Sequence, residues 1–129
     1  MVCIQTCIAM AESLNPIFSN IIRQIIKKSL FTERQIEIIL NQLNLHKTQF
    51  TISKGAYFRQ VKQSRDKLIG LYYTVILLRG LGILVAEDID VISKLSEQVS
   101  VIQSSDVFPE KEEEIMFVIG ELVGRACRV

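Results

Sequence analysis

The residues best suited to bind a ligand lie close together in one short stretch, residues 51–67. The stretch carries five cations against a single acid, Asp66; the cations are Lys54, Arg59, Lys62, Arg65 and Lys67. Lysine and arginine bind phosphate oxygens, arginine also pairs with guanine edges, and glutamine such as Gln63 pairs with adenine edges. These residue types therefore indicate a surface for a polyanion, most simply double-stranded DNA.

A single helix is expected to position these side chains. Ser53 is a favourable N-cap residue, and no helix breaker follows it until the glycines at positions 80 and 82, so the pattern predicts a helix from Ser53 to about Leu78. Successive residues of a helix are about 100° apart around its axis. This spacing puts Tyr57, Val61, Ser64 and Leu68 on one stripe that should face the core. The DNA-binding candidates lie outside that stripe: Lys54, Phe58, Arg59, Lys62, Gln63 and Arg65.

Two segments in this region resemble helix-turn-helix regulators of the LuxR and sigma-factor region-four type. Residues 32–40, TERQIEIIL, are similar to the family's T-x-R-x-x-x-x-L helix, and residues 52–59, ISKGAYFR, to its I-S-x-x-x-V/Y recognition helix. The resemblance covers residues 31–68, and the Ile- and Lys-rich style is similar to small archaeal regulators. It implies a DNA-binding transcriptional regulator whose DNA-facing residues are Lys54, Tyr57, Phe58, Arg59 and Lys62. The helical projection instead assigns Tyr57 to the core.

The chain departs from the family just before the recognition helix. The family has a short helix there, usually with an alanine packed against it, whereas residues 45–51, LHKTQFT, are short and lack that alanine. Either the supporting helix is Glu33 to Leu43 followed by a long turn, or a true helix-turn-helix is absent.

The remaining sequence predicts an all-α fold of five to six helices in a single domain, residues 1–129. Asn15 and Pro16 read as a helix start, Thr32 as the cap of a second helix, Asp88 as the start of another, and Pro109 as the start of the last. Residues 1–13 are also expected to be helical and residues 104–108 to form a linker. The sole candidate for a strand is the short run at residues 82–85, GILV.

Composition and charge favour self-association. Hydrophobic residues make up 49% of the chain and mean hydropathy is +0.30, which is higher than in an ordinary soluble monomer. Residues 31–67 carry seven cations and three acids, and residues 68–129 carry five cations and ten acids. We therefore expect a homodimer that pairs through the acidic, apolar segment 86–129. The predicted interface residues are Ile92, Leu95, Val99, Ile102, Phe117 and Leu122.

Two other interpretations use the same residues. Residues 68–86 are nineteen residues with one charge, which resembles a membrane span, but Arg79 would cost about 2.5–3.5 kcal/mol at the centre of a span. We therefore expect a cytoplasmic protein in which this run is a central helix. The second alternative is a helical interaction module whose basic face binds an acidic protein.

Catalysis and metal binding have little support in the residue types. There are three cysteines, Cys3, Cys7 and Cys127, and one histidine, His46, too few at matched spacing for a structural zinc site. The chain has no nucleophile elbow, no phosphate-binding glycine loop and no acid pair in an apolar setting. The sequence predicts neither an enzyme nor a cofactor.

Overall fold

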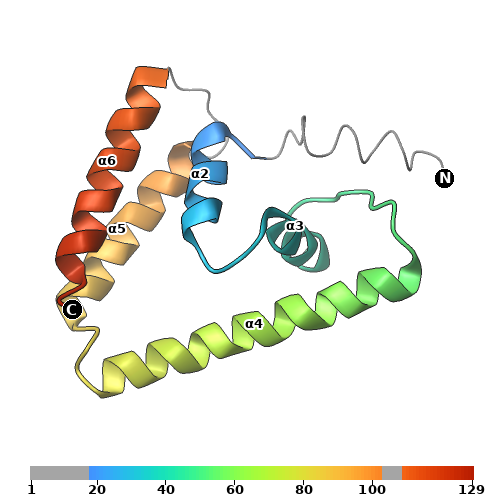
Figure 1. Cartoon of the computed structure of the whole chain (residues 1–129), viewed down its shortest axis with the longest axis horizontal. Helices are drawn as coiled ribbons and strands as arrows, with labels where there is room; N and C mark the ends of the chain where they lie inside the picture. Colours follow the sequence, from blue (N-terminus) through green and yellow to red (C-terminus); the bar gives the residue numbers. More distant parts are fainter. Residues whose placement is uncertain (1–17, 103–108) are drawn as a thin grey trace. The chain divides into compact units, whose positions relative to one another are not determined.

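The computed structural model describes residues 18–102 and 109–129, and these residues form five α-helices and no strand (Figure 1). The helices are α2 (Asn20–Lys28), α3 (Glu33–Gln42), α4 (Lys54–Gly80), α5 (Ala86–Ile102) and α6 (Pro109–Ala126). The predicted all-α fold is confirmed. The fold divides into two compact units. The first includes residues 26–73, and the second includes residues 18–25, 74–102 and 109–129.

In the first unit, α3 begins at the residue that the sequence indicates. The Thr32 hydroxyl accepts a hydrogen bond from the Gln35 backbone N–H at 3.1 Å, and the Gln35 side chain accepts one from the Thr32 N–H at 2.9 Å. This capping box satisfies two backbone donors at the helix start. On the buried side of α3, Ile38 is fully enclosed. The helix ends at Gln42, and an eleven-residue connection, residues 43–53, leads to α4.

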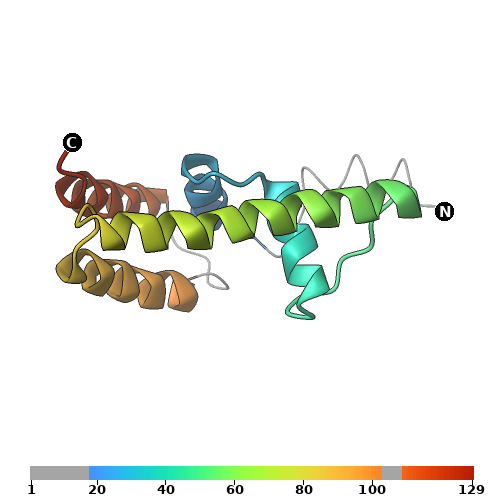
Figure 2. The ribbon, with the colours of Figure 1, turned by 90° about the horizontal axis from the view of Figure 1, so that it is seen from below.

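The basic stretch forms the beginning of α4, which is a single uninterrupted helix of 27 residues (Figure 2). As predicted, Ser53 caps it, because its hydroxyl accepts a hydrogen bond from the Ala56 N–H at 3.1 Å. The helix ends at Gly80, and Gly82 follows with a φ of 79°, in the left-handed region that glycine adopts at low cost.

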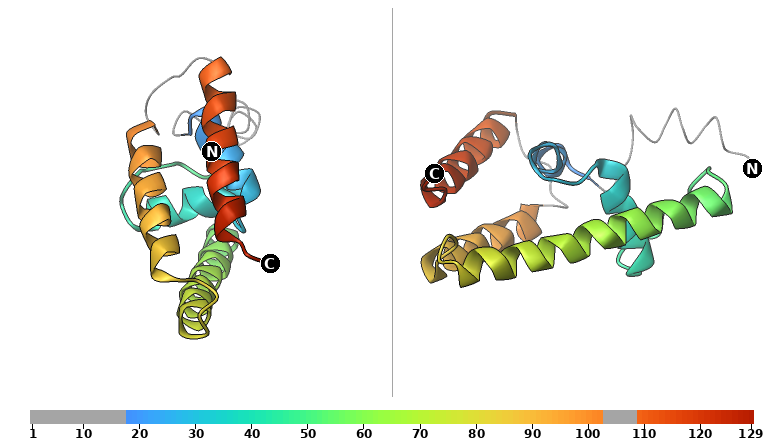
Figure 3. Two further views of the ribbon diagram at one scale, coloured as in Figure 1. Left: turned by 90° about the vertical axis from the view of Figure 1, so that its left-hand side faces the viewer. Right: turned by 60° about the horizontal axis from the view of Figure 1, so that its bottom comes forward.

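In the second unit, α5 and α6 run side by side in opposite directions (Figure 3). Phe18, two residues before α2, and Ile21, in its first turn, are buried here, and the Asn20 amide donates a hydrogen bond to Glu112 of α6 at 2.8 Å. At the start of α5, the buried Asp88 accepts a hydrogen bond from the Val85 N–H at 2.9 Å. The carboxylate therefore caps the helix from inside its first turn.

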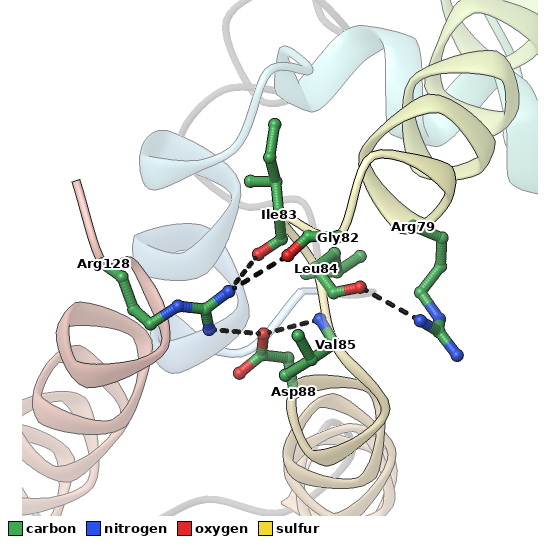
Figure 4. Close-up of polar contacts among 7 residues, drawn as sticks. All are labelled: Arg79, Gly82, Ile83, Leu84, Val85, Asp88 and Arg128. Carbon is green, nitrogen blue, oxygen red and sulfur yellow. Dashed lines mark hydrogen bonds and ion pairs between the residues drawn. The ribbon is translucent and has the colours of Figure 1, made fainter.

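Arg128, which follows α6, contacts the turn between α4 and α5, residues 81–85 (Figure 4). Its guanidinium lies 3.3 Å from the Asp88 carboxylate and donates a hydrogen bond to the Ile83 carbonyl at 2.8 Å. From the other side of the turn, Arg79 donates to the Leu84 carbonyl at 3.3 Å. The two arginines thus satisfy backbone carbonyl groups of the turn, at Ile83 and Leu84, which follow the end of α4.

Several predicted boundaries need correction. Residues 82–85 form a turn rather than a strand, because their carbonyl groups are bonded by Arg79 and Arg128 and not by a neighbouring strand. Ser19 is not helical, and its hydroxyl caps α2 by accepting from the Ile22 N–H at 3.3 Å. The predicted start at Asn15 and Pro16, the helix over residues 1–13 and the linker at residues 104–108 fall outside the described residues.

The apolar run at residues 68–86 is not one helix. α4 ends at Gly80, a turn follows, and α5 begins at Ala86. Among the described helices, none combines the length and the hydropathy needed to cross a membrane.

Candidate nucleic-acid interface

The exposed side of the first part of α4 is the surface that the sequence analysis predicts. Between Lys54 and Leu68, eight residues are exposed: Lys54, Gly55, Phe58, Arg59, Lys62, Gln63, Arg65 and Asp66. At about 100° per residue, all eight lie within one half of the helix circumference. We call this half the basic face. All six DNA-binding candidates belong to it, so the structure brings them together on one side of one helix.

The opposite half of the same helix packs against the rest of the first unit. Ser64 is buried, with 1% of its surface exposed, and Val61 and Leu68 are half-buried. Together with Ile38 and Leu43 they line an apolar cavity of about 240 Å³. The projection from the sequence therefore identifies the buried side of α4 correctly.

Tyr57 is an anchor and not part of the basic face. Its hydroxyl accepts a hydrogen bond from the Asn41 amide at 2.8 Å and donates one to Gln42 at 2.8 Å. Its ring lies against Phe50, with ring centroids 5.3 Å apart. Both capacities of the hydroxyl are used inside the protein, which corrects the DNA-facing assignment that the resemblance implies for Tyr57.

The basic face has an uneven charge distribution. The Lys62 ammonium lies 2.9 Å from the Asp66 carboxylate, one helical turn away. Lys54, Arg59 and Arg65 form no ion pair in the part of the chain that the structure describes. Four cations and one acid therefore give this face a net charge of about +3, with three cations available to a ligand.

Lys67, the fifth cation of the stretch, has a structural position. Its ammonium donates hydrogen bonds to the Leu30 carbonyl at 2.6 Å and to Gln35 at 3.1 Å. It also lies 5.4 Å from the centroid of the Phe31 ring. Lys67 thus connects α4 to the segment before α3. At about 100° per residue it lies on a different side of α4 from the other four cations, and this position is the sequence signal for its role.

Phe50 is the residue at this site that sequence reasoning misses. It contacts Tyr57 on one side, and the Arg34 guanidinium lies 5.6 Å from its ring centroid on the other. Arg34 in turn forms an ion pair with Glu37 at 3.6 Å. Because residues 44–50 have no regular apolar period, the sequence gives no signal for this contact.

The connection before α4 is non-helical over its whole length. Asn44 has a φ of 59°, and the Asn41 side chain accepts a hydrogen bond from the Thr48 N–H at 3.2 Å. The short supporting helix of the resembled family is therefore not present at residues 45–51. The helix before α4 is α3, and eleven residues separate the two, against three or four in a typical helix-turn-helix.

The residues predicted to form a dimer interface lie on α5 and α6. Ile92, Leu95 and Leu122 line an open apolar cavity of about 590 Å³ beside the turn after α4. Val99 and Ile102 are half-buried, and Phe117 is exposed. Because α5 and α6 pack against each other within one chain, part of this apolar surface is covered without a second copy.

Metal-binding residues do not gather in the part of the chain that is described. No group of three histidine, cysteine, aspartate or glutamate side chains lies close enough there to hold an ion. His46 and Cys127 are both exposed, and Cys3 and Cys7 fall outside the described residues.

Comparisons with protein-family models, with curated proteins and with solved structures found no match to this chain. The case for a function therefore depends on the geometry and charge of the site.

Proposed function

We propose that this protein binds double-stranded DNA through the basic face of α4 and acts as a transcriptional regulator. The observation that carries the proposal is the separation of the two sides of the helix, across which Arg65 alone also lines the apolar cavity beside Val61 and Ser64. Every residue that is exposed between Lys54 and Leu68 lies on the half that holds the four cations, while the other half anchors the helix to its own unit. A rigid helix presenting cations in fixed register is suited to a regular array of phosphates.

The details of the basic face suit a major groove. The groove is about 12 Å wide and admits one α-helix. Lys62 lies near the middle of the face and Arg59 between the middle and one edge, where they would contact guanine edges or phosphates. Gln63 lies at that edge, within reach of an adenine. Gly55, also on this face, has no side chain to hold the start of the helix away from the groove.

The interaction-module alternative differs from this proposal in its ligand. An acidic protein would offer carboxylates at irregular positions, and binding would then depend on a few ion pairs. Three of the four cations have no ion-pair partner in the described chain, so each would release a counterion on binding a phosphate. The dependence of affinity on salt therefore separates the two ligands.

The proposal is tested by titrating a fluorescent 30-base-pair duplex with the purified protein at several salt concentrations. If four cations contact phosphates in each protomer, log K should fall with log salt with a slope of about −3 to −4 per basic face. Between 50 and 200 mM salt this amounts to a loss of affinity of about a hundredfold. Absence of duplex binding at 50 mM salt, or an affinity independent of salt, would overturn the proposal.

A further inference from the structure

The apolar cavity of about 240 Å³ between α3 and α4 has features of a ligand site that DNA binding does not use. All eight residues that line it belong to the first compact unit. Five of the eight are apolar: Ile38, Ile39, Leu43, Val61 and Leu68. At the ~30 Å³ that each water molecule occupies in the liquid, this volume corresponds to about eight non-hydrogen atoms. The cavity therefore fits the body of a small organic molecule.

Ser64 places an unsatisfied polar group at the closed end of this cavity. Ile38 and Ser64 are its two buried lining residues, with 0% and 1% of their surface exposed, so they mark its deepest part. The Ser64 hydroxyl has no hydrogen-bond partner among the described residues. A buried hydroxyl without a partner is unfavourable, and a site that contains one favours a ligand that bonds to it. We therefore expect the ligand to carry a hydrogen-bonding group at the end that enters first.

Arg65 places a positive charge at the open end. Gln42, Leu43 and Arg65 are the exposed lining residues, so they mark the rim. Arg65 forms no ion pair in the described part of the chain, and no lining residue is an acid. The Gln42 side-chain oxygen already accepts a hydrogen bond from the Tyr57 hydroxyl at 2.8 Å. Because a guanidinium group binds carboxylates through two parallel N–H bonds, the rim favours an anion.

We propose that this cavity binds a small organic acid with a hydroxyl group at the far end of an apolar body, of the hydroxybenzoate class. The carboxylate pairs with Arg65, the body contacts the apolar side chains, and the hydroxyl bonds to Ser64, whose own hydroxyl can donate or accept. A hydrocarbon would leave the Ser64 hydroxyl without a partner, and Arg65 would repel an amine.

Such a ligand would also act on the basic face, a consequence that rests on the proposed function. At about 100° per residue, Arg65 lies about 40° around α4 from Val61, so it stands at the border between the basic face and the cavity. A carboxylate bound to Arg65 removes one of the four cations available to phosphates. We expect saturating ligand to weaken duplex binding about fivefold and to reduce the salt slope by about 1.

Ligand-observed NMR titrations of the full-length chain without DNA test the site. The better of para- and meta-hydroxybenzoate should bind with a Kd of about 1 mM or tighter, which is reasonable for a ligand of about ten non-hydrogen atoms. Benzoate, which lacks the hydroxyl, should bind about fivefold more weakly. Phenol, which lacks the carboxylate, should bind about tenfold more weakly.

Two substitutions assign these differences to the two residues. Ser64→Ala should remove the preference for hydroxybenzoate and leave the affinity for benzoate unchanged. Arg65→Gln should weaken both acids about tenfold without weakening phenol. Lys94→Gln removes an exposed cation from α5 and is the control for net charge, so it should leave all three affinities unchanged.

Absence of saturable binding by either hydroxybenzoate at about 10 mM would overturn the proposal. So would a preference for hydroxybenzoate that survives Ser64→Ala, or an affinity for benzoate that survives Arg65→Gln. Because these titrations contain no DNA, a chain that binds hydroxybenzoate but no duplex would contradict the proposed function and leave the site intact. A duplex affinity that saturating hydroxybenzoate lowers no more than acetate does, at equal ionic strength, would contradict the predicted competition for Arg65.

Discussion

Substitution of Asp66 is the simplest way to change the charge of the basic face. It is the one acid among residues 51–67, and its carboxylate holds the Lys62 ammonium at 2.9 Å. Replacing it with asparagine frees Lys62 for a phosphate and removes a negative charge that would lie near the DNA. We expect Asp66→Asn to raise duplex affinity about threefold, or about 0.7 kcal/mol, because exposed ion pairs are weak competitors. Fluorescence anisotropy at one salt concentration measures the change.

The control for this substitution is Glu97→Gln, which removes an exposed acid from α5 and changes net charge by the same amount. It should leave duplex affinity nearly unchanged. Equal gains in the two variants would show that total charge, and not the basic face, governs binding.

A substitution of Tyr57 distinguishes a residue that holds α4 in place from one that binds DNA. Tyr57→Phe keeps the ring against Phe50 but removes the hydroxyl that bonds both Asn41 and Gln42. We expect the free energy of unfolding to fall by about 1 kcal/mol in urea titrations, because the part-buried Asn41 amide loses its partner. Duplex affinity of the folded variant should not change. A loss of DNA binding by Tyr57→Phe with normal stability would place Tyr57 in the interface instead.

At the scale of elements, Ser64 shows how α4 is held against its unit. It is 1% exposed, and its hydroxyl has no hydrogen-bond partner among the residues that the structure describes. Burying a polar group without a partner is unfavourable, and alanine is also the better helix former. We therefore expect Ser64→Ala to raise the free energy of unfolding by about 1 kcal/mol. Differential scanning calorimetry checks this as a rise in Tm of several degrees.

The neighbouring exposed Gln63→Ala serves as the comparison for helix propensity, since it changes no buried group. A lower Tm for Ser64→Ala would contradict this prediction and show that the Ser64 hydroxyl makes a stabilising contact in the folded protein.

Several helix ends were predictable here from local signals. The Thr32 and Ser53 caps, the glycines at positions 80 and 82 and the proline at the start of α6 act through backbone groups within a few residues, so the sequence shows them. Asp88 was a less accurate signal, because α5 begins two residues earlier, at Ala86. The same is true of the two sides of α4, which follow from helical period. Phe50 could not be predicted, because its place between Arg34 and Tyr57 depends on the path of residues 43–53. The spacing of apolar residues in α5, such as Leu95 and Val99, likewise predicts which side of the helix packs against another element, but it does not identify that element.

For the whole molecule, charge and hydropathy are arranged along the chain. Residues 31–67 hold an excess of four cations and residues 68–129 an excess of five acids, so the net charge of +1 conceals a strongly dipolar chain. The acids of α5 and α6 would repel a polyanion there, which leaves the basic face as the favourable contact.

The most direct test of the DNA-binding proposal compares two double variants with equal change in net charge. Arg59→Glu with Lys62→Glu reverses two cations on the basic face, and Lys94→Glu with Lys111→Glu reverses two exposed cations on α5 and α6. Duplex affinity is measured at 100 mM salt after calorimetry has shown that each variant is folded. We predict that the first variant loses at least about a hundredfold in affinity and the second less than about fivefold. Equal affinities in the two variants would contradict the proposal that the basic face of α4 binds DNA.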